Sequence, residues 1–143
     1  MASASHFIDS NIPMYARGAE HPLKAPCVAV LSQLARGQVA GIVSVEVIQE
    51  IVHRYTSIGR RDLAQQVVDR FLVVVPAVLP VTPADMRLML TYLAEFPGLS
   101  ARDLLHVAVM VNNGIQAIIS TDTDFDRVPH ITRLDPRSFM TRG

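Results

Sequence analysis

The chain has 143 residues, half of them hydrophobic, and its 13 basic residues balance 13 acidic ones. This length predicts one domain, residues 1–143, whose core can bury roughly 68–70% of the chain's surface. The balanced charge excludes a strongly basic nucleic-acid-binding protein, so any contact with nucleic acid has to come from a local patch.

Three features of the sequence bear on the compartment. No apolar run approaches the ~18 residues of a membrane span, so we expect no membrane association. The first residues lack a basic start followed by an apolar core, so we expect no secretory signal. Cys27 is the only cysteine, which excludes an internal disulfide and suits a reducing environment. We therefore expect a cytoplasmic protein.

In the first half of the chain, strand patterns alternate with helix patterns. In chain order, the expected elements are a strand at 6–8, a helix at 22–36, a strand at 41–43, a helix at 45–58 and a helix at 60–71. Residues 10–13 are expected to end the first strand and to form an irregular segment. Gly37 closes the first helix, and Ser44 is a suitable N-cap for the second.

The second half repeats this alternation. Its expected elements are a short strand within 72–81, a helix at 82–95, a helix at 100–113, a strand at 115–120 and a strand at 131–134. Pro76 and Pro80 predict that the first of these strands lies near a sheet edge. The run at 115–120 is uncharged and β-branched, as in a strand buried on both faces of a parallel sheet. Pro136 begins a short tail. Together the halves predict an α/β fold with a parallel sheet covered on both faces.

Carboxylates from distant parts of the chain are expected at one edge of this sheet. Ligands of such sheets bind beyond the carboxyl ends of the strands, near the point where strand order reverses. Asp9 and Asp122 each follow a strand. Helices that follow strands begin at the same edge, so Glu46 and Glu50, and Asp103 early in its helix, are expected to join them.

Crowded carboxylates favour a divalent cation. Ionised carboxylates within ~4–6 Å repel one another and favour protonation. Mg²⁺ or Mn²⁺ removes this penalty and prefers oxygen ligands. Such an ion can orient a water molecule and stabilise charge on a phosphate during displacement, so no serine, cysteine or histidine nucleophile is required.

Four segments occur in an order and spacing typical of a known family: FIDSNIPMY, SVEVIQEIV, LSARDLLHVAV and IISTDTDFD. Over nearly its whole length, the chain resembles the PIN-domain ribonucleases, most closely the VapC-type toxins of prokaryotic toxin–antitoxin pairs. The resemblance implies a three-layer α/β/α sandwich around a mainly parallel sheet. It also implies endonucleolytic cleavage of RNA that depends on Mg²⁺ or Mn²⁺, a homodimer, and a small antitoxin that fills the active-site groove.

The resemblance also implies which residues form the site. The catalytic and metal-binding carboxylates fall on Asp9, Glu50, Asp103 and Asp122, with Asp124 as a further metal ligand. The supporting polar residues fall on Ser10, Asn11 and Thr121.

Alternatives remain open at several acidic positions. Glu46 lies on the same helix face as Glu50 and competes with it. Asp103 follows Ser100 by three residues, so it could serve only as part of a capping box. Asp124 competes with Asp122 as the last metal ligand. Asp126 is more typical of a turn residue or a helix cap.

An EF-hand, suggested by the alternating aspartates, is excluded because Arg127 and Arg133 occupy its required glycine and glutamate positions. We expect His106 to be a hydrogen-bonded core histidine. Solvated surface positions are expected for His53, Arg54, Arg60 and Arg61.

The main alternative function is a catalytically inactive PIN-like module for RNA binding or assembly. The intact carboxylates oppose it, because a surface that only binds RNA gains from fewer acids and more cations. A phosphatase of another aspartate-dependent α/β family would need Asp-x-Asp after the first strand, where this chain has Asp9, Ser10 and Asn11.

Overall fold

The computed structural model describes residues 4–140 and arranges them around a parallel sheet. Within this range five strands pair in the order β3-β2-β1-β4-β5, and every pairing is parallel. The strands are β1 (His6–Ile8), β2 (Gly41–Ser44), β3 (Val78–Leu79), β4 (Ala117–Ile119) and β5 (Thr132–Leu134). The short β3 lies at an edge, as the prolines around it predict.

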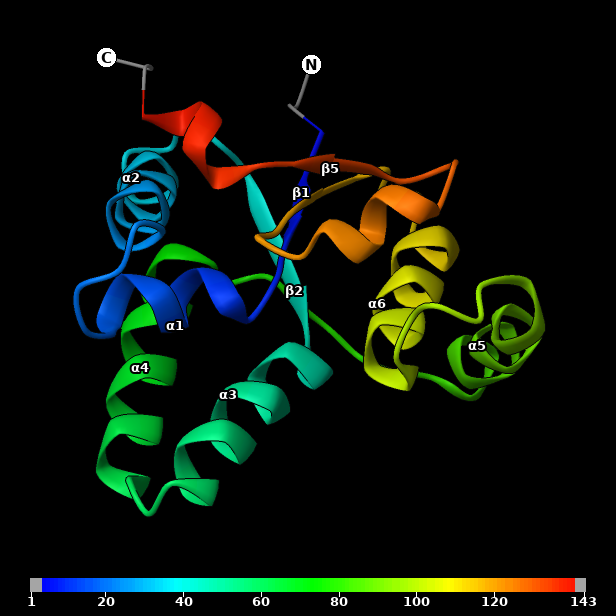
Figure 1. The fold of residues 1–143 in the computed structure, drawn as a ribbon, viewed down its shortest axis with the longest axis horizontal. Helices are drawn as coiled ribbons and strands as arrows, with labels where there is room; N and C mark the ends of the chain where they lie inside the picture. The colour runs from blue at the N-terminus through cyan, green and yellow to red at the C-terminus, as the bar shows by residue number, and fades with distance from the viewer. Residues whose placement is uncertain (1–3, 141–143) are drawn as a thin grey trace.

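Helices cover both faces of this sheet, which confirms the three-layer α/β/α architecture. The helices are α1 (Asn11–Arg17), α2 (Lys24–Ala35), α3 (Val45–Ser57), α4 (Arg61–Val74), α5 (Pro83–Glu95) and α6 (Ala101–Asn112). Figure 1 shows α1, α2 and α4 on one side of the sheet and α5 and α6 on the other, while α3 extends from the carboxyl end of β2. Two 3₁₀ helices follow, η1 (Thr123–Arg127) and η2 (Pro136–Phe139).

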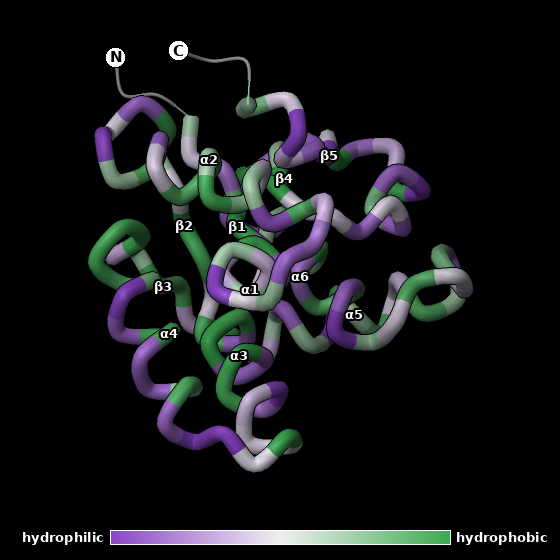
Figure 2. The backbone as a smooth tube through the Cα atoms, turned by 60° about the vertical axis from the view of Figure 1, so that its left-hand side comes forward, coloured by the Kyte–Doolittle hydropathy of each residue, from purple (hydrophilic) through white to green (hydrophobic). Residues whose placement is uncertain are grey.

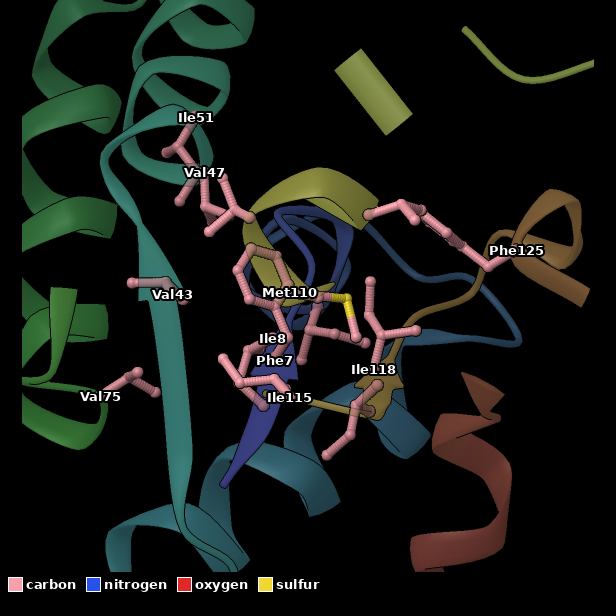
Figure 3. Close-up of a cluster of buried hydrophobic side chains, with 14 of the residues drawn as sticks. Phe7, Ile8, Val43, Val47, Ile51, Val75, Met110, Ile115, Ile118 and Phe125 are labelled. Carbon is pink, nitrogen blue, oxygen red and sulfur yellow. The ribbon is translucent and has the colours of Figure 1, made fainter. Parts of the chain in front are cut away.

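The hydrophobic core is centred on the middle strand. Phe7 and Ile8 of β1 are fully buried, and Figure 3 shows them with Val47 of α3 on one side and Ile118 of β4 on the other. Each such side chain contributes roughly 1.5–3 kcal/mol by leaving water. Figure 2 shows the same separation along the backbone, with hydrophobic positions in β1 and β2 and long hydrophilic stretches in α4.

The strand order reverses between β1 and β4. The chain passes from β1 through β2 to β3 on one side, and then returns to place β4 and β5 on the other. Ile8 is paired with Ile119 in the register of β1 and β4. Asp9 and Ser120 therefore leave adjacent strands side by side, and the Asp9 N–H donates to the Ile119 carbonyl at 3.1 Å.

The structure differs from the sequence-based prediction in two segments. The expected break after β1 is instead the start of α1, which tolerates Pro13 because first-turn N–H groups have no intrahelical partner. The expected tail is η2, whose Phe139 is buried. The Gln33 side chain on α2 donates to the Phe139 carbonyl at 2.9 Å, so this segment is anchored to the fold.

The reason given for the position of Asp103 was wrong, although the position was right. Its helix, α6, follows α5 and not a strand. The side chain of Asn112, at the end of α6, donates to Asp85, near the start of α5, at 2.8 Å, so the two helices run antiparallel. The α6 helix begins at the carboxyl edge of the sheet, because Asp103 in its first turn lies beside Asp122 and interacts with Asp9, and it ends at Asn112, shortly before β4.

None of the helices within residues 4–140 combines the length and the apolar character that a bilayer crossing requires.

Candidate metal centre

Asp9 lies at the strand-order reversal with both carboxylate oxygens held by hydrogen bonds. Its side chain is buried, and Oδ1 accepts the Ser10 backbone N–H at 2.8 Å. Oδ2 accepts from the Ser120 hydroxyl at 2.6 Å and from the Asn11 amide at 3.1 Å. Burial raises the pKa of Asp9, although the nearby charge of His106 and the bond from Ser120 oppose this rise. The carboxylate is thus fixed in orientation.

Ser120 ties the turn after β1 to the loop after β4. Its Oγ accepts from the Asp122 backbone N–H at 3.0 Å and from the Asn11 side chain at 3.2 Å. The Asn11 Oδ1 atom accepts from the Thr121 backbone N–H at 3.3 Å. Asn11 thus contributes its side chain, whereas Ser10 and Thr121 contribute backbone N–H groups. Ser120 was not among the predicted site residues, although its position directly after β4 is a signal in the sequence that could have identified it.

Glu50 reaches the same edge from α3 and bonds to His106 of α6. The Glu50 Oε1 atom lies 2.5 Å from the His106 Nε2 atom, and His106 is fully buried. Burial lowers the pKa of His106, but the bond to Glu50 and the negative charges of Asp9 and Glu50 outweigh it, and the pKa is raised overall. The expected hydrogen-bonded core histidine is confirmed. Asp9, Glu50 and His106 each offer a ligand atom, all within 4.8 Å of one another.

A second group consists of Asp103, Asp122 and Asp124, which each offer an oxygen within 4.8 Å of the others. Burial and the negative charges of Asp9 and Asp122 raise the pKa of Asp103 to about 7. Since Asp9 acts on Asp103 in this way, the two groups adjoin. Ser100 caps α6 by accepting the Asp103 N–H at 3.2 Å, and the Asp103 side chain interacts with Asp122. Asp103 can therefore take part in the N-cap of α6 through its backbone N–H and belong to the candidate metal centre through its side chain.

Two competing acids lie apart from these groups. Glu46 belongs to neither candidate group among the residues that the structure describes. Asp126 pairs with Arg133 of β5, at 2.9 and 3.2 Å, and so holds η1 against the sheet. Arg133 also donates to the Ser120 carbonyl at 3.0 Å, a link that the sequence analysis missed. The four residues expected on the surface, His53, Arg54, Arg60 and Arg61, are exposed.

The donors of the Asp103 group fit a divalent cation. They are all carboxylate oxygens, which Mg²⁺ and Mn²⁺ prefer. Within residues 4–140, the one basic side chain in an ion pair with this group is the exposed Arg127, 3.8 Å from Asp124. The pKa of Asp103 is raised to about 7 by burial and by the charges of Asp9 and Asp122, although the charge of His106 opposes this rise. A bound cation would relieve the repulsion that the protein leaves uncompensated.

The PIN-domain family model matches residues 6–131. The chain belongs to the PIN-domain family. Among PIN-domain relatives, ribonuclease VapC13 of Mycobacterium tuberculosis is 42% identical over 127 residues, which cover 89% of this chain and 97% of that protein.

Solved structures share the fold of this chain. One is VapC20 of Mycobacterium tuberculosis, a sarcin-ricin loop cleaving toxin, with a TM-score of 0.72 and 21% identity over 87% of this chain and 95% of that chain. Another is VapBC2 of Rickettsia felis bound to a promoter DNA fragment, with a TM-score of 0.71 and 17% identity over 90% of this chain and 96% of that chain.

Proposed function

We propose that this PIN-domain protein is a VapC-type endoribonuclease, the toxin of a type II toxin–antitoxin pair. It cleaves RNA phosphodiester bonds with the help of Mg²⁺ or Mn²⁺. One observation carries the proposal: Asp9, Glu50 and the Asp103 group meet where the strand order reverses, in a chain 42% identical to ribonuclease VapC13.

In this proposal five carboxylates form the site. Asp9, Glu50, Asp103 and Asp122 are the catalytic residues, and together with Asp124 they are the metal ligands. The crowding at Asp103 supports a cation between Asp9 and the Asp103 group, and Glu50, which His106 holds beside Asp9, completes the set from α3. Between the alternatives Glu46 and Glu50, the structure supports Glu50, which adjoins Asp9 and His106.

A bound Mg²⁺ or Mn²⁺ would supply positive charge that polarises an attacking water molecule and offsets the charge developing on the phosphate. The chain's own contribution is to hold the carboxylate oxygens in place before RNA arrives. Ser120 and Asn11 orient Asp9, and His106 orients Glu50. Because these groups are already in place, they do not have to reorient when charge develops in the transition state. Preorganisation of this kind is usually the largest electrostatic contribution to catalysis.

The proposed partners are RNA, a small antitoxin and a second copy of the chain, and the proposed compartment is the cytoplasm. The fold shared with the VapBC2 complex supports an antitoxin partner. On α5, the exposed side chains of Met86, Leu90 and Leu93 form an apolar stripe that suits a protein contact.

The test is cleavage of total cellular RNA by the purified protein. We expect fragments with Mn²⁺ and none with a chelator or in the Asp9→Asn variant. The matched control is Asp69→Asn, which changes an exposed carboxylate on α4 whose side chain, within residues 4–140, is bonded only to Gln65, and this variant should cleave normally. Cleavage by Asp9→Asn would refute the proposal. RNA binding without any cleavage would favour the inactive PIN-like module.

A further inference from the structure

A groove adjoins the candidate metal centre between α1 and α3, which lie side by side in Figures 1 and 2. Its volume is about 540 Å³, and its wall includes Asn11, Tyr15, His21, Arg54 and Tyr55. This size is typical of sites that enclose a small organic group. Asn11 also donates to the Asp9 carboxylate, so the groove and the metal centre share a wall. We call this feature the Tyr15 groove.

Two rings are held in contact in the Tyr15 groove. The ring centroids of Tyr15 and His21 lie 4.8 Å apart, with an angle of 39° between their planes. The His21 Nδ1 atom accepts the Leu23 backbone N–H at 3.0 Å, which fixes the orientation of the imidazole ring. Tyr15 is half-buried and His21 is exposed. A preformed aromatic surface of this kind can stack a planar group without first being ordered.

Positive charge borders the Tyr15 groove, because Arg54 is one of the residues that line it. Arg54 follows Glu50 by one helical turn on α3. Arg17 and Lys24 line a smaller hollow of about 330 Å³ that shares Gly18, Ala19 and Tyr55 with the groove. Burial raises the pKa of Tyr55, and the charges of Arg17 and Arg54 oppose this rise.

These arginines have no acidic partner of their own. Within the part of the chain that the structure describes, no carboxylate forms an ion pair with Arg17 or Arg54. The neighbouring Lys24 lies 4.0 Å from Glu20, whose side chain is 96% exposed. Glu20 also lines the groove, but the three cations Arg54, Arg17 and Lys24 outnumber it and make this strip a local positive patch on a chain with no net charge.

We propose that the Tyr15 groove binds single-stranded RNA beside the cleavage site. One unpaired base stacks on Tyr15 and His21, and Arg54 and Arg17 contact the adjoining phosphates. The chemistry matches RNA, because proteins stack single-stranded bases on aromatic rings and contact the backbone with arginine. A duplex fits less well, since its bases are already stacked on one another. The proposal rests on the proposed function, in which RNA reaches the metal centre.

The experiment measures binding of a fluorescently labelled single-stranded RNA 12-mer of mixed sequence, followed by anisotropy. All variants carry Asp9→Asn, and the buffer contains chelator, so that no cleavage occurs. The slope of log K against log salt concentration is negative, and Arg54→Gln should make it less steep by about 0.7, the value for one phosphate contact to a single strand. Arg87→Gln is the matched control, because Arg87 is an exposed arginine on α5, and its slope should not change.

Substitutions of Tyr15 test stacking. Tyr15→Leu should weaken binding about fivefold or more, because stacking on one base is lost, while the salt slope stays the same. Tyr15→Phe keeps the ring and should retain the affinity, which distinguishes stacking from a general loss of packing. Equal weakening by leucine and phenylalanine would overturn the stacking, and a slope for Arg54→Gln equal to that for Arg87→Gln would overturn the phosphate contact.

Failure of this inference can be distinguished from failure of the proposed function. If the unmodified protein cleaves no RNA but the groove variants show the expected losses, the groove stands and the nuclease proposal fails. If the protein cleaves RNA while the groove variants bind like Arg87→Gln, the groove proposal fails alone. Unchanged RNA binding in the groove variants would overturn the inference, and weaker binding of the proposed antitoxin by the same variants would assign the groove to that protein instead.

Discussion

Replacing Asp103 by asparagine removes charge from the most crowded part of the centre at nearly constant volume. Burial and the charges of Asp9 and Asp122 raise the pKa of Asp103 from 3.8 to about 7. A carboxyl with a raised pKa in the folded state contributes stability that is fully present below pH ~4 and is lost as the pH rises through about 7. Above pH 7 the metal-free protein therefore bears the full cost of this charge, whereas the Asp103→Asn variant does not.

The size of the effect follows from the pKa. The rise from 3.8 to about 7 is roughly three units, each worth about 1.36 kcal/mol, which gives an upper bound of about 4 kcal/mol. Screening by solvent at a half-buried carboxylate reduces this to about 2 kcal/mol. For a chain of this length the variant should gain about 4–8 °C in Tm at pH 8, and the gain should vanish near pH 4.

The assay is thermal unfolding between pH 4 and pH 8 in the presence of chelator, with Asp69→Asn as the control for an exposed carboxylate. Adding Mn²⁺ should then stabilise the unmodified protein and the control, since a ligand of the folded state raises Tm, and should stabilise Asp103→Asn far less. The reasoning is refuted if Asp103→Asn unfolds like the unmodified protein at every pH, or if Mn²⁺ stabilises both equally.

Three further substitutions test the contacts that support the centre. His106→Leu leaves Glu50 without its partner and should lower the free energy of unfolding by about 3 kcal/mol in urea denaturation, with partial recovery when Glu50→Gln is added; an unchanged urea midpoint would contradict this. Ser120→Ala removes the hydroxyl that bonds Asp9 and should cost about 1–3 kcal/mol and reduce RNA cleavage, whereas Ser120→Thr should retain the contact if the methyl group fits. Arg133→Met removes the bonds that hold Asp126 and the Ser120 carbonyl, and it should weaken Mn²⁺ binding, measured by calorimetry, while the fold persists. Unchanged Mn²⁺ affinity would show that Arg133 does not position the loop that carries Asp122.

The sequence predicted the strands and two of the acidic positions for a simple physical reason. Uncharged β-branched runs such as residues 115–120 have few alternatives to a buried parallel strand. The carboxyl ends of parallel strands share one edge of the sheet, so Asp9 and Asp122 could be expected there. Local patterns sufficed because each of these residues directly follows its strand.

Other contacts depend on pairings that local patterns do not contain. His106 and Glu50 are 56 residues apart, and each taken alone is an ordinary helical residue. The Ser120 contact with Asp9 depends on the register of β1 against β4. Asp103 was expected at this edge on the premise that its helix follows a strand, whereas α6 follows α5.

The central claim is that carboxylates from β1, α6 and the loop after β4 share one divalent cation. Anomalous diffraction from a crystal soaked in Mn²⁺ tests it most directly. We expect a peak at about 2.1 Å from oxygens of Asp9, Asp103 and either Asp122 or Asp124. A protein that cleaves RNA but shows its manganese peak away from these oxygens would contradict the account.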